Sequence, residues 1–402
     1  MPAATRTAPD RTARFGVAFI GLLLIAVNLR VSFVSVGPVL GNISSDLELS
    51  SAAAGLLTGL PLIAFAVFSP LAPGFASRLG LDRALWVSLL ILASGIVLRS
   101  LPLPGVIWAG TALIGLAIAF LNVLVPSLVK RDFPMRVSQV TGGYTATQAA
   151  FAAIGAAVVV PVAQTSPAGW RVALGIWAGL ALVAMAVLLP WLRRHRSSSS
   201  THATTPEVSF RSPWVSALGW QVTVFMGLQS IAFYVLMAWL PTIEQSQGVP
   251  ATTAGVHLSV FLLISVFASL ATGGILHRGS DQRLVSFASG ALAFVTFLGL
   301  ALAPDLILLW VILGAIGCGS LIVIALSLFS LRTVNYPQAA SLSGMAQSVG
   351  YGLAAAGPVL FGGLRDVSGG WTLPLLVTAG LMAVLALTGL LVGRDRVISG
   401  ST

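Results

Sequence analysis

The chain has 402 residues, of which 57% are hydrophobic and only 8% are charged, and its mean hydropathy is +0.98. Soluble domains carry about 25% charged residues, so this composition excludes a soluble domain and predicts an integral membrane protein built from spanning helices. The net charge of +10 does not indicate a nucleic-acid partner, because the basic residues lie in short loops between apolar runs.

Twelve apolar segments long enough to cross a bilayer follow one another along the chain. They cover about residues 15–40, 51–76, 84–101, 104–129, 138–163 and 170–192 in the first half, and 214–241, 251–276, 284–303, 305–331, 338–363 and 371–393 in the second. The first run is too long for the core of a signal peptide, so we expect an uncleaved first span. The basic, Ser/Thr-rich segment 193–213 is typical of a flexible linker.

Positive charge is distributed unevenly between the two sides of these spans. Of the 21 Lys and Arg residues, 17 lie on the side of the N-terminus, and Arg99, Arg171 and Arg365 lie on the other side. Cytoplasmic loops carry an excess of Lys and Arg. The pattern therefore predicts a multi-pass protein of the plasma (inner) membrane with both termini and the linker in the cytoplasm.

The two halves of the sequence repeat one another at an offset close to 200 residues. The matching landmarks are Pro38 and Pro241, Arg78–Arg83 and Arg278–Arg283, Gln148 and Gln347, and Gly169-Trp170 and Gly370-Trp371. Six spans per half is an even number, so both halves run in the same direction. The repeat predicts an all-α membrane protein of two pseudo-symmetric six-helix bundles, residues 1–192 and 214–402, with a binding site between them near the midplane.

A parallel 6+6 repeat with a basic central loop resembles the major facilitator superfamily. Further motifs look like the cyanate/nitroimidazole transporter family: Asn28-Leu29-Arg30 with Gly37-Pro38, residues 122–134 (NVLVPSLVKRDFP), Gly227–Ser230 with Tyr234 and Trp239-Leu240-Pro241, and residues 343–351 (SGMAQSVGY) with Gly357-Pro358. The resemblance implies a transporter of small molecules. Ser77 stands where the superfamily usually has an acidic residue, and we expect the loop residues Arg78, Arg83, Arg278 and Arg283 to act in gating.

Arg30 is the charged residue that lies deep inside an apolar run. An arginine at bilayer depth costs roughly 2.5–3.5 kcal/mol, so it must face a polar interior. Buried charges are normally paired, and no carboxylate falls near the middle of a span. We therefore expect Arg30 to contact an anion or an electron-rich substrate. The alternative is an arginine that satisfies backbone carbonyls near the break at Gly37-Pro38.

Polar residues on other spans are candidates for lining the same site. Tyr144, Gln148 and Phe151 share one helix face, and Ser343, Gln347 and Tyr351 share another in the repeat-equivalent span. Six further polar residues complete the set: Asn28, Ser32, Ser35, Asn122, Gln229 and Tyr234. The alternative for each of them is hydrogen bonding between helices.

His257 is the histidine inside a span and is a candidate for proton coupling, although it could also be a polar residue of the outer vestibule. Five acids, Asp46, Glu48, Glu244, Asp305 and Asp366, fall at or beyond the outer ends of spans. Since no phosphate-binding loop or Cys/His cluster is present in the sequence, we expect no cofactor and no metal.

Two functions fit these residues. The first is secondary active transport of a small anionic or weakly acidic solute, cyanate-like or related, by alternating access and with protons as a candidate coupling ion. The second is export of small heteroaromatic drugs such as nitroimidazoles, with Arg30 bonded to a nitro group and Tyr351 and Trp239 stacked on the ring. An intramembrane enzyme lacks its nucleophile, acid or metal set, and a channel lacks a symmetric filter. We expect a monomer in the lipid bilayer.

Overall fold

The computed structural model describes residues 11–166, 168–196 and 211–398, which form helices and no strand. The first half contains α1 (Arg11–Val34), the 3-10 helix η1 (Gly37–Val39), α2 (Leu40–Asp46), α3 (Ser51–Phe68), η2 (Ser69–Leu71), α4 (Ala72–Leu79), α5 (Leu81–Ser100), α6 (Val106–Asp132), α7 (Val137–Thr165), α8 (Trp170–Gly175) and α9 (Ala178–Arg196). The second half contains η3 (Pro213–Val215), α10 (Ala217–Ser246), α11 (Ala251–Leu276), α12 (Arg283–Leu302), η4 (Pro304–Leu306), α13 (Ile307–Leu331), α14 (Tyr336–Ser368) and α15 (Thr372–Val392).

Eleven segments of the described chain are long and apolar enough to cross a membrane. They correspond to eleven of the twelve predicted spans, and the twelfth is α14, which is 33 residues long but more polar. Its polarity has a structural reason, because α14 packs against α3, α4 and α6 of the other half as well as against its own bundle. The predicted all-α membrane fold is confirmed.

Several spans are interrupted where proline removes a backbone donor. The second span bends at η2, which contains Pro70, between α3 and α4. Proline has no N–H, so the carbonyl oxygen of Ala66, four residues earlier, loses its partner within the helix. Ser348 of α14 donates its hydroxyl to this oxygen at 2.6 Å. The break in one half therefore supplies an acceptor for the other half, as expected for proline in packed membrane helices.

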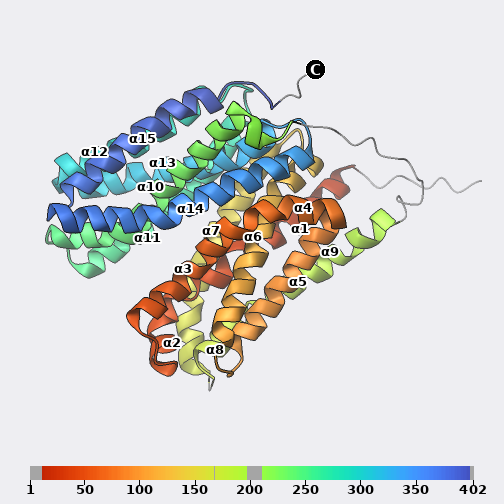
Figure 1. The fold of residues 1–402 in the computed structure, drawn as a ribbon, viewed down its shortest axis with the longest axis horizontal. Coiled ribbons are helices and arrows are strands. Elements are labelled where there is room, and N and C mark those ends of the chain that lie inside the picture. Colours follow the sequence, from red (N-terminus) through yellow and green to blue (C-terminus); the bar gives the residue numbers. More distant parts are fainter. Residues whose placement is uncertain (1–10, 167, 197–210, 399–402) are drawn as a thin grey trace, which may run out of the picture.

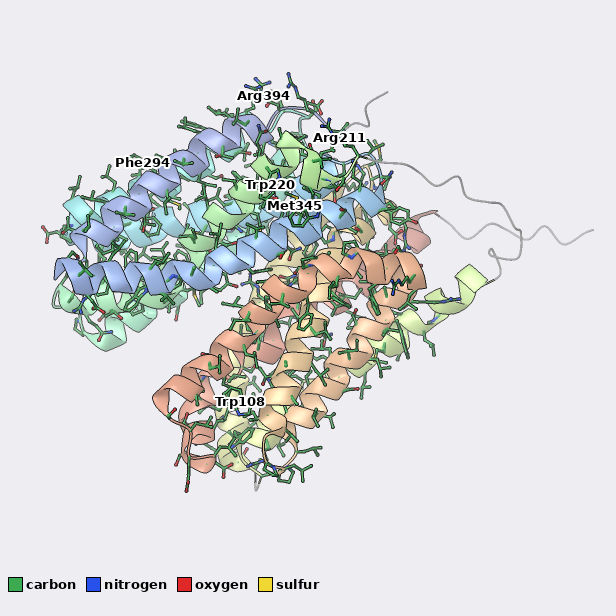
Figure 2. The ribbon with its side chains drawn as sticks, in the orientation of Figure 1. Trp108, Arg211, Trp220, Phe294, Met345 and Arg394 are labelled. Carbon is green, nitrogen blue, oxygen red and sulfur yellow. The ribbon has the colours of Figure 1, made fainter. Side chains whose placement is uncertain are left out.

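The two halves meet at one end of the molecule and diverge toward the other (Figure 1). We call the end where α9 ends and α10 begins the linker end, and the opposite end, which contains Asp46 and Ser246, the far end. Arg211 and Arg394 mark the linker end in Figure 2, and Trp108 marks the far end of the first half. Most of the predicted linker, residues 197–210, lies outside the described residues.

A close backbone approach between the halves is made by α7 and α11 near the linker end. A Cβ atom added to Gly142 would lie 2.9 Å from the backbone oxygen of Ser269, and one added to Gly273 would lie 2.7 Å from that of Ser138. Real Cβ atoms do not approach backbone atoms so closely. Both glycines are therefore needed for the backbones to pack in this way.

Candidate functional site

A cavity of about 20 Å³ lies between the halves, where their contact ends. Its lining residues come from both bundles: Leu29, Arg30, Phe33, Phe65, Asn122, Val125, Tyr144 and Gln148 from the first, and Tyr234, Ile322, Leu326 and Tyr351 from the second. A buried water requires about 10–15 Å³, so this space holds little more than one water. A larger solute requires the lining side chains to move apart.

Six of the residues that the sequence proposed for the substrate site line this cavity, namely Arg30, Asn122, Tyr144, Gln148, Tyr234 and Tyr351. They are brought together from five helices, α1, α6, α7, α10 and α14. Three of the four tyrosines of the chain are in this set. The lining thus combines one guanidinium with amides, phenols and phenylalanine rings, and it contains no carboxylate.

The guanidinium of Arg30 faces aromatic rings. Its central carbon lies 5.6 Å from the ring centroid of Phe233 on α10, which is within the range of a cation–π contact. The ring of Tyr351 lies 5.1 Å from that of Phe65, at a tilt of 59°, so rings from both halves surround the cavity. Within the described chain, Arg30 forms no ion pair. The positive charge inside the cavity is therefore available to a ligand.

Arg99 is an arginine of the same protein that is arranged differently from Arg30. The sequence placed Arg99 on the outer side, but the structure buries it to 1% exposure in the last turn of α5. It donates a hydrogen bond to the backbone oxygen of Ser32 at 2.9 Å, close to the end of α1. Arg332, beyond the spanning part of α13, likewise donates to the backbone oxygen of Val392 at 2.8 Å, and burial lowers its pKa to about 10. These two arginines donate to backbone carbonyls, whereas Arg30 has no such bond to a residue that the structure describes.

Asn28 and Gln229, which were also proposed for the site, lie outside the cavity. The Asn28 amide donates to the backbone oxygen of Leu24 at 2.8 Å and to that of Leu180 at 3.4 Å, inside the first half. It precedes Arg30 by two positions, or about 200° around the helix, so the two side chains point in opposite directions. Gln229 donates to the hydroxyl of Ser230 at 2.9 Å.

Gln347 lies at the contact between the halves, just outside the cavity. Its amide donates to the backbone oxygen of Asn122 at 3.0 Å and to the hydroxyl of Ser343 at 2.7 Å. The Asn122 oxygen is free because Pro126, four residues later on α6, has no N–H. This is the same arrangement as at Pro70. Trp239 also lies apart from the cavity, where it donates its indole N–H to Pro358 of α14 at 2.9 Å.

Glu244 corrects one inference from the sequence. The span was expected to end at Pro241, which would have placed Glu244 in an outer loop, but α10 continues through Pro241 to Ser246. The Glu244 side chain is 0% exposed, and its Oε2 lies 2.8 Å from Nδ1 of His257 on α11. The described chain therefore contains a fully buried carboxylate near the far end of the second half, at the end of its span.

The loop arginines Arg78, Arg83, Arg278 and Arg283 are all exposed at the linker end. A different residue joins the halves there. Lys130, in the last turn of α6, donates from Nζ to the backbone oxygens of Ser330 and Thr333, both at 2.8 Å. These oxygens lie at the carboxyl end of α13, where a cation is favoured by the helix dipole. The sequence offered one signal for Lys130, a cation in the terminal turn of a long apolar span.

Comparisons with known proteins agree with this architecture. Residues 18–358 match the family model described as Major Facilitator Superfamily. The chain is 41% identical to the 2-nitroimidazole transporter of Escherichia coli (strain K12) over 383 residues, 95% of this chain and 96% of that protein. It is 28% identical to the cyanate transport protein CynX of the same organism over 369 residues, 90% and 94% of the two chains.

Among solved structures, the proton:xylose symporter XylE superposes with a TM-score of 0.76 at 12% sequence identity, covering 97% of this chain and 98% of XylE. At this identity the likeness concerns the fold.

Proposed function

The chain belongs to the major facilitator superfamily and is a membrane transporter, not an enzyme, and on this premise we propose that it carries a small anionic or weakly acidic solute by alternating access. The solute would bind between the halves, which we take as residues 1–192 and 214–402, and they would rock around it. Residues 193–213 would act as the connecting linker, and we expect a monomer.

The observation that carries this proposal is the state of Arg30. It is partly exposed in the cavity, and its described contacts are aromatic rings rather than carbonyls or carboxylates. A planar guanidinium can donate to two acceptors of one anion at once. The Gln148 and Asn122 amides and three tyrosine hydroxyls are near enough to complete the ligand's hydrogen bonds.

The second candidate is a small heteroaromatic solute, and the aromatic lining favours it. Five of the twelve lining residues are Phe or Tyr, and rings stack well on other rings. A nitro group has two planar oxygens, as a carboxylate does, so Arg30 can bond to either. The relative named as a 2-nitroimidazole transporter supports this candidate, and the cyanate transport protein supports the first.

We further propose that the linker end faces the cytoplasm, which agrees with the excess of Lys and Arg on that side. The conformation described here would then be open to the outside.

The test of this orientation uses a Cys318→Ser background and single cysteines at Ser280, in the loop after α11, or at Ser368, at the end of α14; both positions are exposed. An impermeant thiol reagent added to intact cells should label position 368 and not position 280. The reverse pattern would invert the orientation.

A binding screen followed by transport separates the two solutes. Purified protein is heated with cyanate, benzoate or 2-nitroimidazole, since a ligand at 100 times its Kd stabilises the folded state by about 2.7 kcal/mol. Each stabilising compound is then tested for uptake into proteoliposomes. Uptake of the two anions, with 2-nitroimidazole inert, supports the first candidate. Uptake of 2-nitroimidazole alone supports the second, and no binding of any compound would reject both assignments.

A further inference from the structure

Glu244 is a buried acid that the substrate site does not use. Among the described residues it is the Asp or Glu whose side chain is fully buried. One carboxylate oxygen, Oε2, contacts Nδ1 of His257 at 2.8 Å, and the other, Oε1, is buried without a hydrogen-bond partner. The His257 side chain remains 15% exposed, so the pair extends from the interior of the bundle to its surface.

The net charge of this pair depends on one bound proton. With one proton shared between them, Glu244 and His257 form a neutral unit, either as an ion pair or as two uncharged groups. Without that proton, a carboxylate would remain buried with no compensating cation, which is costly in a low-dielectric region. The arrangement described here therefore favours the protonated pair.

Among the described residues, no other charged group near Glu244 can replace the proton. The helices that pack against α10 are α11, α13, α14 and α15. On α13 the titratable group is Cys318, near the middle of the helix, and α15 has none. At the far end, Asp305 before α13 is exposed, and Arg365 and Asp366 of α14 are exposed and paired with each other at 3.0 Å. On α11, the titratable group is His257.

The pair is mechanically connected to the substrate cavity through α10. This helix carries Phe233, which contacts Arg30, and Tyr234, which lines the cavity. Glu244 follows Tyr234 by ten residues, or about 15 Å along the axis. Pro241 lies between them and interrupts the hydrogen bonds of the helix. Bonding of Glu244 to His257 therefore fastens the part of α10 beyond Pro241 to α11.

We propose that Glu244 and His257 form a proton-binding site, filled from the far side, whose occupancy stabilises the far-end-open arrangement and makes substrate loading depend on pH at that side. Linkage gives the direction. The arrangement that buries the carboxylate binds the proton more tightly, so protons favour this arrangement and a rise in pH disfavours it. The effect on loading rests on the proposed transport function, whereas the effect on conformation does not.

The test measures conformation without any substrate. Two spin labels are attached at Asn42→Cys and Ser368→Cys, one at the far end of each half, in a Cys318→Ser background; both native positions are exposed. We call this the far-end label pair, and its long distance reports the arrangement described here. Raising the pH from about 5.5 to about 8.5 should lower the long-distance population about threefold or more, as expected for linkage to one titrating site. In Glu244→Gln the population should not change with pH.

Asp305→Asn, which neutralises an exposed acid at the same end, is the matched control and should behave as wild type. If Glu244→Gln does not purify as a monodisperse protein, His257→Gln replaces it and should shift the midpoint of the response by at least about one pH unit, because the carboxylate loses its partner. An unresponsive wild type, or a Glu244→Gln or His257→Gln variant that responds as wild type does, overturns the proposal.

Uptake of 2-nitroimidazole and benzoate, at a fixed interior pH, gives the functional arm. Wild-type uptake should fall as the far-side pH rises, and Glu244→Gln should lose this dependence. A preserved spin-label response with no uptake of any probe would reject the proposed function and leave the proton site intact. Uptake that requires Arg30 but has the same pH profile in wild type and Glu244→Gln would support the proposed function and reject the proton site.

Discussion

The two ends of the contact between the halves are held in different ways. Between the linker end and the cavity, six hydrogen bonds cross between the halves of the described chain, and in every one a side chain donates to a backbone oxygen. The donors are Ser127, Lys130, Ser330, Gln347 and Ser348. At the far end, the described ion pairs, such as Asp46 with Arg171 and Glu244 with His257, each lie within one half.

This difference indicates which contacts must break when the protein changes from one arrangement to the other. Closing the far end and opening the linker end would require these six bonds to break, and each contributes about 0.5–1.5 kcal/mol net. Two of the acceptors, on Ala66 and Asn122, are available because a proline four residues later lacks an N–H. Because no crossing ion pair is present among the described residues, single donors can be removed without leaving a buried opposite charge.

Arg30 lies at the boundary between the closed end and the open end, and its removal should have the largest effect. A charged hydrogen bond at a buried site contributes about 1.5–3 kcal/mol, so Arg30→Ala should weaken binding of the transported probe roughly 10- to 150-fold. Arg30→Lys should not restore it, because lysine offers a point charge instead of a planar fork. Calorimetric titration checks this.

Arg365→Ala, which removes an exposed arginine at the far end, is the control and should bind as wild type. Normal binding and transport by both Arg30 variants would show that this charge is structural.

Gly142 tests the closed end directly. A methyl group here would lie 2.9 Å from the backbone oxygen of Ser269, so Gly142→Ala must push α7 and α11 apart. Overpacking of this kind costs about 1–3 kcal/mol. The long-distance population of the far-end label pair should fall accordingly. Gly143→Ala is the matched control, since its methyl group would meet only Phe19 at 3.5 Å. Equal populations in the two variants would exclude the α7–α11 contact as the element that holds the linker end closed.

Much of the fold could be predicted because the bilayer restricts it so strongly. Hydropathy found the spans, including α14 despite its polar residues. Arg30, Tyr144 and Gln148 could be proposed for the site because polar groups at bilayer depth need a polar environment. What periodicity could not fix was the rotation of each helix about its axis. Asn28 and Arg30 share a helix, but only Arg30 faces the other half.

Two charged residues show a second limit of the sequence. The span of Glu244 was expected to end near Pro241, yet α10 continues to Ser246, because membrane helices tolerate proline when neighbours satisfy the freed groups. Arg99 was assigned to the outer side of the membrane, and its burial there depends on the backbone oxygen of Ser32 on a helix that is distant in sequence. In both cases the burial of the side chain depends on tertiary partners, which a single sequence does not contain.

Lys130 should contribute less than the glycine contact. Lys130→Met keeps the apolar stem but removes both hydrogen bonds to α13, at a cost of about 1 kcal/mol because the ammonium is only partly buried. The ratio of linker-end-closed to linker-end-open molecules should fall about fivefold, as measured with the far-end label pair. The exposed Arg278→Met at the same end is the control and should leave the ratio unchanged. If the two substitutions have the same effect, the linker end responds to total charge and not to this contact.

The smallest effect is expected for two residues that are equivalent in the repeat but differ in position. Gln148 lines the cavity, whereas Gln347 donates to the Asn122 oxygen that Pro126 leaves free. Gln347→Met should therefore shift the far-end label distribution by about 0.5–1 kcal/mol, or roughly two- to fivefold, with little change in the intrinsic affinity for the probe. Gln148→Met should lower the affinity and leave the distribution unchanged.

Pro126→Ala tests the same contact from the side of the acceptor, since the restored N–H would compete for the Asn122 oxygen and should shift the distribution as Gln347→Met does. Identical phenotypes for the two glutamine variants would show that both amides serve the cavity, as the symmetry of the sequence alone would suggest.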